Sequence, residues 1–321
     1  MQLVFLGTSS GTPTKSRNVS AIGVKQDDSK FWCLVDCGEG TQHRILNTKL
    51  ALNHLEAIFI THVHGDHCFG LPGLLATSSL LGRTDPLTIV GPAGIDEFVK
   101  TSQRISETSF GFEIKFIEVS SCTDQLQTRY FNVDIAKLSH RVPSYAYVFT
   151  EKHVEKTLNV DRLKADGVDS GPEWGKLQKG QNVKLADGRT LLASDYLLIP
   201  RKARKIIISG DNDNPQLLQK YSDGLDVLVH EATFTEDALA RVGKGPQHST
   251  AKMVAEFAES ISLKNLILTH FSARYRDSGE SPVISDIEDE ARRAYSGILY
   301  LAKDFEIYRL DKAGNLKNDE T

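Results

Sequence analysis

The sequence predicts an α/β fold in which helices cover the outer faces of stacked sheets. Short apolar runs typical of buried strands alternate with helix-like stretches in both halves of the chain. These apolar runs end repeatedly in His or Asp, which would gather polar side chains at one edge of the sheets. A charged segment with little apolar periodicity, at about residues 151–204, interrupts the alternation and indicates an inserted arm.

Length and composition limit the class of protein. The chain has 321 residues, of which 40% are hydrophobic, so it can bury a sizeable core in one large domain or two smaller ones. Its net charge of -4 gives no global basic excess, so phosphate binding must come from local patches. No apolar run reaches the roughly 18 residues of a membrane-spanning helix, so we expect no membrane contact.

The cysteines and the first residues indicate where the protein works. The four cysteines form no C-x-x-C pair, and Cys68 directly follows a histidine-rich motif. Thiols beside a metal site fit a reducing compartment better than a disulfide framework. The stretch Met1–Gly7 is too short and too poorly charged for a signal peptide. We therefore expect a cytoplasmic protein.

In the first half of the chain, apolar runs between turn residues predict strands, and longer periodic stretches predict helices. The strands are expected at residues 3–6, 21–25, 31–35, 57–60, 87–90, 112–119 and 130–138. The helices are expected at residues 41–50, at 70–81 and from 95 onward.

The second half follows the same alternation after the charged segment. The strands are expected at residues 205–209, 226–233 and 266–270, with one final strand at 305–308. Helices are expected up to residue 260, with Ser249 or Thr250 as the N-cap, and at residues 284–295. The polar tail after Asp311 is expected to be frayed.

The stretch Thr61–His67 is the strongest chemical signal in the sequence, because it holds three histidines and one aspartate. His62 and His64 are two residues apart, so an extended backbone presents both on one face. Gly65 permits a tight turn, after which Asp66 and His67 can point into the same space. Imidazole and carboxylate suit zinc or a neighbouring transition metal. Four ligands would crowd one ion that must keep an open position, so the motif predicts two metals. The alternative is a solvated polar loop.

Other polar residues at strand ends can complete such a site. The candidates are His140, Asp211, His230 and His270, each of which follows an apolar run. A lone histidine such as His140 is more often structural, but a metal cluster elsewhere still needs ligands. Asp36 is either an acid that orients a ligand histidine or a plain helix cap.

Two stretches carry local positive charge. Lys15 and Arg17 lie in a Gly-, Ser- and Thr-rich loop, which is either a solvated loop or a phosphate-contacting one. The arm at about residues 151–204 carries lysines and arginines that could grip a nucleic-acid backbone, and a solvated excursion is the alternative. Four of its basic residues are Lys176, Lys179, Lys184 and Arg189.

On these residues the chain resembles the metallo-β-lactamase superfamily. The match rests on His62-Val63-His64-Gly65-Asp66-His67 together with His140, Asp211 and His270. Within the superfamily, the chain resembles the ribonuclease Z family of tRNA 3′-processing endonucleases over nearly its whole length. That closer resemblance rests on Phe5–Thr8, Pro13–Asn18, Asp36–Gln42, Phe69–Gly73, His230–Thr233, His248–Thr250 and Thr269–Tyr275.

The resemblance implies an αββα four-layer sandwich over residues 1–321, with the arm as a flexible exosite for the tRNA elbow around Gly171 and Pro172. It implies two Zn²⁺ per subunit and a homodimer in which the arm serves the partner's site. One zinc would be bound by His62, His64 and His140, and the other by Asp66, His67 and His270, with Asp211 bridging.

The resemblance also implies a mechanism and a substrate, precursor tRNA. Asp66 would orient or deprotonate the attacking water, and His248, supported by Glu231, would protonate the leaving 3′ oxygen. His230 is either a helper in that network or a buried structural histidine. The products would be a tRNA with a 3′-hydroxyl and a trailer with a 5′-phosphate. Contacts to the substrate would come from Lys15, Arg17, Asn18, Gly171, Pro172 and Arg274.

Three departures from the family pattern affect fine geometry rather than class. They are Asn212 where the family has Thr, Gln247 where it has Gly, and Ala146 where it has Gly between two tyrosines. Two rival functions also remain. A metallo-hydrolase of small phosphodiesters or esters would keep the ligands but have no use for the basic loop and the arm. An RNA-binding scaffold would have no reason to keep a complete set of ligands.

Overall fold

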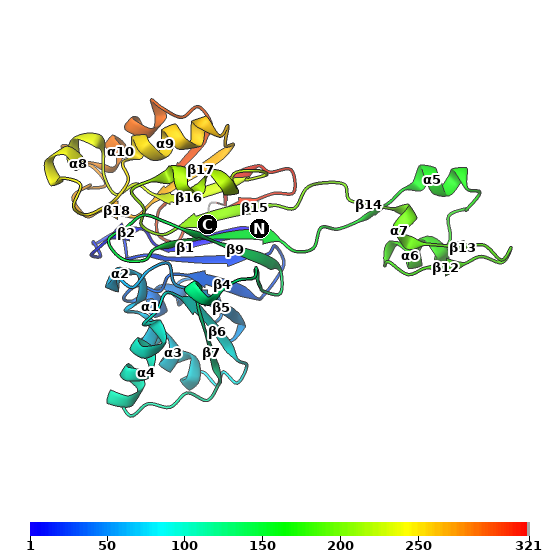
Figure 1. The fold of residues 1–321 in the computed structure, drawn as a ribbon, viewed down its shortest axis with the longest axis horizontal. Coiled ribbons are helices and arrows are strands. Elements are labelled where there is room, and N and C mark those ends of the chain that lie inside the picture. The colour runs from blue at the N-terminus through cyan, green and yellow to red at the C-terminus, as the bar shows by residue number, and fades with distance from the viewer. Residues whose placement is uncertain (320–321) are drawn as a thin grey trace. The chain divides into compact units, whose positions relative to one another are not determined.

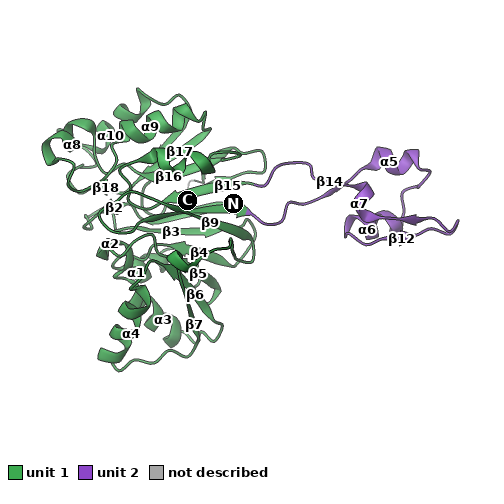
Figure 2. Ribbon diagram, in the orientation of Figure 1, with its two compact units in different colours: residues 1–150, 204–321 green, residues 151–203 purple. Residues whose placement is uncertain are grey.

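The computed structural model describes residues 1–319, and Figure 1 shows their course along the chain. The chain forms two compact units, which Figure 2 colours separately. Unit 1 holds Met1–Thr150 together with the chain from Arg204 onward, and unit 2 holds Glu151–Ala203. Among the described helices, none combines the length and the hydropathy that a lipid bilayer demands.

Two sheets form the middle of unit 1. The eight-stranded sheet has the order β21 (Leu316–Asp319), β20 (Ile307–Leu310), β1 (Gln2–Gly7), β3 (Ala21–Lys25), β4 (Trp32–Val35), β5 (Leu55–Phe59), β6 (Leu87–Gly91) and β7 (Ile114–Glu118). The seven-stranded sheet has the order β19 (Ile298–Leu301), β17 (Asn265–Thr269), β16 (Val227–Glu231), β15 (Lys205–Ser209), β10 (Tyr145–Glu151), β9 (Phe131–Lys137) and β8 (Leu126–Gln127).

Helices lie outside both sheets, as Figure 1 shows. The eight-stranded sheet is flanked by α1 (Thr41–Ile45), α2 (Gly65–Cys68), α3 (Leu71–Leu80) and α4 (Ile95–Ile105). The seven-stranded sheet is flanked by α9 (Ala251–Ser260) and α10 (Ile284–Arg292), with α8 (Glu236–Val242) beside them. Two short strands, β2 (Ser9–Ser10) and β18 (Phe271–Ser272), pair in parallel. Short 3₁₀ turns are η1 (Leu52–His54), η2 (Val119–Ser121) and η3 (Pro215–Tyr221).

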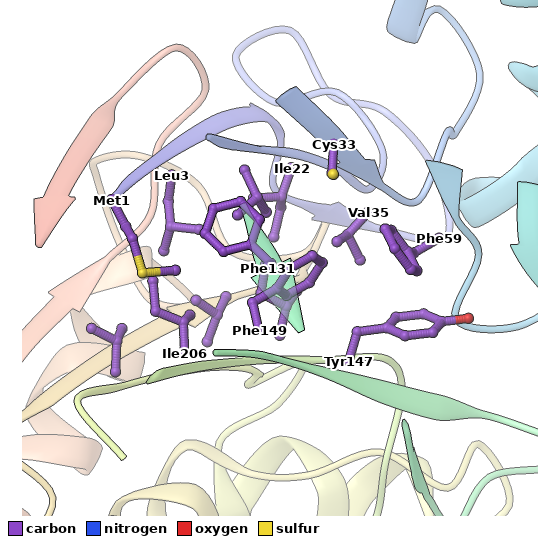
Figure 3. Packing of buried hydrophobic residues seen from close by; sticks show 14 of the residues in the cluster. Met1, Leu3, Ile22, Cys33, Val35, Phe59, Phe131, Tyr147, Phe149 and Ile206 are labelled. Carbon is purple, nitrogen blue, oxygen red and sulfur yellow. The ribbon is translucent and has the colours of Figure 1, made fainter. Parts of the chain in front are cut away.

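Three apolar layers hold unit 1 together. The central layer lies between the sheets and contains an aromatic group in which Phe59 packs 5.0 Å from Tyr147 and 5.3 Å from Phe149, measured between ring centroids (Figure 3). The other two layers lie between each sheet and its helices. Fully burying one large apolar side chain is worth roughly 1.5–3 kcal/mol, so the three layers supply most of the driving force for this sandwich.

The topology brings the polar strand ends together. Strands β4, β5, β6 and β7 run parallel, and so do β15, β16, β17 and β19. The carboxyl ends of parallel neighbours lie at one edge of a sheet, where open α/β sheets bind their ligands. The predicted strand-end residues therefore gather at this edge.

The predicted helix at residues 41–50 is shorter in the structure, because α1 ends at Ile45. Polar side chains just past this end compete for the helix carbonyl groups. The Thr48 hydroxyl donates to the carbonyl of Ile45 at 2.8 Å, and the Asn47 amide donates to that of His43 at 3.1 Å. Such local bonds favour turns over a continued helix.

The end of the chain also differs from the prediction. Instead of one final strand, β19 and β20 lie in different sheets, and the connection between them crosses from one sheet to the other. The tail after Asp311 is not frayed as far as it is described, since β21 pairs with β20 in antiparallel register. Residues 320–321 of that predicted tail lie outside the described residues.

Unit 2 has a small core of its own. Its elements are β11 (Thr157–Leu158), α5 (Val160–Ala165), α6 (Pro172–Gln178), β12 (Val183–Lys184), β13 (Thr190–Leu191), α7 (Ala193–Tyr196) and β14 (Leu197–Leu198). The core consists of Leu163, Val168, Leu177, Val183, Leu191, Ala193 and Tyr196. The elements are too short to show apolar periodicity, which is why the sequence suggested an arm with little core.

Candidate metal centre

The ends of β5, β9, β15 and β17 bring the seven predicted ligands to one place. His62 and His64 follow β5, while Asp66 and His67 lie on the short helix α2. The other three come from the loops after β9, β15 and β17 and are His140, Asp211 and His270. They form two groups with ligand atoms within 4.8 Å of one another, His62–His64–His140–Asp211 and Asp66–His67–His270.

Ring nitrogens of neighbouring histidines face each other in this centre. Nε2 of His62 lies 3.1 Å from Nδ1 of His64, and Nε2 of His140 lies 3.3 Å from the same atom. In the other group, Nε2 of His67 lies 3.2 Å from Nε2 of His270. Lone pairs that converge in this way can share a cation.

The opposite nitrogen of four histidines is held by an outer partner. Nδ1 of His67 donates to Asp36 at 2.6 Å, and Nδ1 of His140 donates to the carbonyl of Gln247 at 2.9 Å. Hydroxyl groups hold Nδ1 of the other two histidines. The Thr61 hydroxyl lies 3.0 Å from Nδ1 of His62, and the Thr233 hydroxyl lies 3.0 Å from Nδ1 of His270. Because a carboxylate and a carbonyl only accept, His67 and His140 carry their proton on Nδ1 and present Nε2 as a ligand atom.

The carboxylates of the centre also fit a cation. Oδ1 of Asp211 is a buried oxygen with no hydrogen-bond partner among the described residues, although Nε2 of His67 and of His270 lie 3.5 and 3.4 Å away. An unpaired carboxylate oxygen inside a protein is costly unless it binds an ion. Oδ2 of Asp66 accepts the backbone N–H of Gly11 at 2.7 Å.

The electrostatics of the centre point the same way. Burial lowers the pKa of His62, which keeps its imidazole neutral as a metal ligand must be. Burial alone would lower the pKa of His67 too, but the carboxylates of Asp36, Asp66 and Asp211 raise it well above its usual value. The field inside the cluster is therefore strongly negative. Together with the histidine-rich donor set, this fits divalent transition metals such as zinc.

His248 and Glu231 form a hydrogen-bonded pair beside the ligands. Nδ1 of His248 donates to Oε1 of Glu231 at 3.1 Å and lies 3.7 Å from Oδ2 of Asp211. Burial lowers the pKa of His248, but the charge and the hydrogen bond of Glu231, with the charge of Asp211, raise it to about 9. Glu231 is fixed in turn by the Thr233 hydroxyl at 2.6 Å and by the Ser249 N–H at 2.9 Å.

His230 lies apart from this pair in the core. It is fully buried, and its Nδ1 donates to the backbone carbonyl of Glu231 at 2.7 Å. Its Nε2 accepts the side-chain amide of Asn212 at 3.1 Å, so both ring nitrogens are used by the protein. The other end of Asn212 accepts the N–H of Ser139, directly before His140. The structure thus gives Asn212 a bonding role at a position where the family has Thr.

The predicted substrate residues of the basic loop are placed differently from one another. Lys15 is exposed, whereas Arg17 is only 6% exposed and is bonded inside the protein. The Asn18 side chain donates to the carbonyl of Glu39 at 2.8 Å. Of these three, Lys15 is the one whose side chain is free to meet a partner without breaking a bond in the described structure.

The other predicted substrate residues lie in both units. Arg274 is exposed and stacks over Phe234 at 4.9 Å, and the Phe234 ring in turn packs edge-on against His248 at 5.9 Å. Gly171 and Pro172 lie at the N-terminus of α6 in unit 2, where Gly171 is the N-cap residue.

The residues that support the ligands were harder to recognise. Asp36 contacts Thr61 and His67 with its carboxylate, and the N-cap of α1 is Gly40, so the structure favours the orienting role over the helix cap. Thr233 belongs to the His230–Thr233 motif but carries no chemical signal of its own, and the backbone contributions of Gly11 and Gln247 leave no signal in side-chain chemistry.

Three residues of the centre have a left-handed backbone conformation. Asp36, Gln247 and His270 have φ values of 59°, 55° and 59°, in the left-handed region that costs a non-glycine residue roughly 1–2 kcal/mol. A glycine at position 247, as the family resemblance implies, would adopt this conformation without that cost. Gly210 shows a different constraint, since a Cβ there would lie 2.6 Å from Cβ of Thr61.

Comparison with known proteins finds a family model that matches part of the chain and relatives that match nearly all of it. A protein-family model described as "Anti-Pycsar protein Apyc1" matches residues 1–102, less than half of the chain. Ribonuclease Z of Marinobacter nauticus is 50% identical over 313 residues, which cover 97% of this chain and 97% of that protein.

Solved structures agree. The short form of human tRNase Z has a TM-score of 0.67 at 28% identity and covers 97% of this chain and 100% of that one. The metallo-β-lactamase fold protein YhfI of Bacillus subtilis has a TM-score of 0.65 at 18% identity, over 95% of this chain and 98% of that one, a likeness of fold alone. The predicted four-layer fold is confirmed.

Proposed function

Because this chain belongs to the ribonuclease Z family, we propose that it is a zinc-dependent endoribonuclease that removes the 3′ trailer from precursor tRNA. The observation that carries the proposal is the pairing of a complete ligand set with an adjacent histidine–glutamate pair. Seven His and Asp side chains converge, and Nδ1 of His248 lies 3.7 Å from one of them, Asp211. This arrangement suits hydrolysis of a phosphodiester.

We propose two zinc ions per subunit. His62, His64 and His140 would hold one ion, and Asp66, His67 and His270 the other, with Asp211 between them. When bound, two such ions lower the pKa of water toward about 7 and neutralise the charge that develops on a phosphate. The protein holds the ligands in place through Asp36, Thr61, Thr233 and the Gln247 carbonyl.

Two side chains would move protons. Asp66, held by the Gly11 N–H, would orient the attacking water and accept its proton. His248 would donate a proton to the 3′ oxygen of the tRNA as the bond from phosphorus to that oxygen breaks. Glu231 would stabilise the protonated imidazole through its hydrogen bond. The products are a tRNA with a 3′-hydroxyl and a trailer with a 5′-phosphate. His230 would serve this pair only indirectly, through the Glu231 backbone.

Substrate selection would come from outside the metal centre. The exposed Lys15 and Arg274 are available to phosphates near it. Unit 2, with Gly171 and Pro172 at the start of α6, would act as an arm that binds the tRNA by shape. We further propose a homodimer, as the family resemblance implies. The free cysteines, including the buried Cys33, Cys37 and Cys68, suit work in the cytoplasm.

The proposal is tested by mapping cleavage of a 3′-extended precursor tRNA with the zinc-loaded protein. We expect a single cut after the discriminator base, with a 3′-hydroxyl on the tRNA. Asp66→Ala should lower the rate by at least about 10²-fold, since it removes a ligand and the proposed base. Asp96→Ala, which changes a partly exposed aspartate on α4 that pairs with Lys100, is the matched control and should keep full activity.

Two results would contradict the proposal. Hydrolysis of a small phosphodiester without cleavage of precursor tRNA would indicate a small-substrate hydrolase. Binding of tRNA without any hydrolysis would indicate a scaffold.

A further inference from the structure

Asp304 lies in the connection that crosses from β19 to β20 and is not one of the predicted ligands. Its side chain is only 3% exposed, and its carboxylate receives hydrogen bonds from three directions. Oδ1 accepts the Thr8 hydroxyl at 2.7 Å. Oδ2 accepts the backbone N–H of Asn18 at 2.7 Å and the guanidinium of Arg44 at 2.6 Å. Thr8 and Asn18 are the two ends of the basic loop, so one carboxylate joins both ends.

Arg17 extends this network. Its Nη1 donates to the Thr8 hydroxyl at 2.9 Å and to the carbonyl of Ala302 at 2.8 Å. Its guanidinium also lies 5.1 Å from the centre of the Phe271 ring, and Phe271 directly follows the ligand His270. A chain of hydrogen bonds, called the relay below, therefore runs from Arg17 through the Thr8 hydroxyl to Asp304. The buried guanidinium is held by these contacts and by an ion pair between Nη2 and Asp277 at 3.6 Å, while its Nε has no hydrogen-bond partner among the described residues.

The loop that this network closes reaches the metal centre. Its base is closed by the Asn18 carbonyl, which accepts the N–H groups of Thr8 and Ser9. At its tip the N–H of Gly11 donates to Oδ2 of Asp66 at 2.7 Å, and Lys15 lies exposed farther along the loop. A shift of the loop would move the Gly11 donor away from Asp66 and move the Lys15 charge.

We propose that Asp304 and Arg17 are positioning residues, which hold the loop Thr8–Asn18 so that Gly11 fixes Asp66 and Lys15 faces the substrate. This assignment rests on the proposed function, and it gives Arg17 a role other than direct contact with a phosphate. The ion pair in this network joins Asp304 to Arg44. A buried ion pair adds little net stability compared with well-packed apolar residues, so we infer that the network serves to select one loop geometry.

The test is Asp304→Asn in the zinc-loaded protein. An amide has one acceptor oxygen, so it cannot receive the Thr8, Asn18 and Arg44 donors together. Hydrogen exchange of the Gly11 amide should become about tenfold faster, because a hydrogen bond that holds the loop is lost. The kcat for precursor tRNA should fall roughly 10- to 100-fold, as expected when a catalytic group is misplaced by about 1 Å.

Asp27→Asn is the matched control. Asp27 also receives two cations, the N-terminal amine at 2.6 Å and Arg204 at 2.8 Å, but it follows the far end of β3, at the opposite end of the sheet from Gly7. It should change thermal stability without changing exchange at Gly11 or kcat. Thr8→Val, which breaks the relay and keeps the side-chain shape, provides a second variant and should reproduce the Asp304→Asn pattern.

The outcomes separate cleanly. Faster exchange at Gly11 together with a lower kcat in Asp304→Asn and Thr8→Val, but not in Asp27→Asn, supports the positioning role. Unchanged exchange at Gly11, or an equal loss of kcat in Asp27→Asn, overturns it. If the wild-type protein does not cleave precursor tRNA, the proposed function is wrong, and the exchange rates alone decide the positioning role.

Discussion

The role of each histidine in this centre depends on what its ring nitrogens bind on the side away from the other ligands. Each imidazole of His62, His67, His140 and His270 uses one nitrogen for an outer partner, which leaves the other nitrogen for a metal. The same logic separates His248 from His230. His248 binds Glu231 through Nδ1, which leaves its Nε2 outside that bond. His230 instead uses both ring nitrogens in hydrogen bonds within the fold.

This difference leads to a prediction for His248. His248→Ala should lower kcat for precursor tRNA by roughly 10²–10⁴-fold, because the 3′ oxygen is a poor leaving group without a proton. A bis(p-nitrophenyl) phosphate substrate carries a stable leaving group, so its hydrolysis should fall far less. The measurement is kcat on both substrates at saturating zinc.

The control for this prediction is His43→Ala, which removes an exposed histidine on α1 and should change neither rate. An equal loss on both substrates in His248→Ala would show that His248 supports the metal centre rather than protonating the leaving group.

At this scale the sequence predicts ligands better than their supports. The contiguous motif Thr61–His67 carries its own chemistry, and the distant ligands were identified by strand ends and family resemblance. Asp304 had no such signal, since its bond to Asn18 joins residues 286 positions apart. The sequence predicts Arg17 either in a solvated loop, because charged loop residues are usually exposed, or as a phosphate contact, and only the structure shows that its side chain is buried.

Helices and strands are predicted well where the local sequence determines them and poorly where contacts with distant segments do. Strands such as β3 and β15 match the predicted ranges, because apolar runs bounded by turn residues determine them locally. The early end of α1 depends on side-chain competition that periodicity does not capture. The pairing of β21 with β20, and the small core of unit 2, come from contacts between short segments with weak signals of their own.

Unit 2 can be tested as an element. In it Leu158 pairs with Leu197, so a short Gly-Ser linker can replace residues 159–196 and leave β11 and β14 intact. Cutting at residues 167–184 instead would remove Leu177 and expose the rest of the small core. We expect the excised protein to keep its activity on a small phosphodiester, while kcat/KM for precursor tRNA falls roughly 10²-fold through lost phosphate contacts.

The salt dependence of tRNA binding provides a second measurement on the same excised protein. Each lost phosphate contact should reduce the slope of log affinity against log salt by roughly 0.7–0.9. Unchanged cleavage and an unchanged slope would show that unit 2 does not bind the tRNA.

The whole molecule explains why the site needs this fold. No single segment supplies the centre, because its donors come from both sheets, and packing between the sheets brings the two edges together. The central layer in Figure 3 therefore supports catalysis as well as stability. The layered architecture was predictable from the alternation of strands and helices. The crossing from β19 to β20 was not, because the order of strands in a sheet depends on contacts that sequence patterns do not reveal.

We propose that two ions at this one centre enable the protein to cut precursor tRNA. The most direct test is to titrate the metal-free protein with zinc and follow cleavage of a 3′-extended precursor tRNA, mapped to the nucleotide. We predict no cleavage without zinc, full activity at two equivalents per chain, and one cut after the discriminator base. Full activity without zinc or at one equivalent, or cuts scattered along the tRNA, would show that a two-ion centre is not what cuts the tRNA.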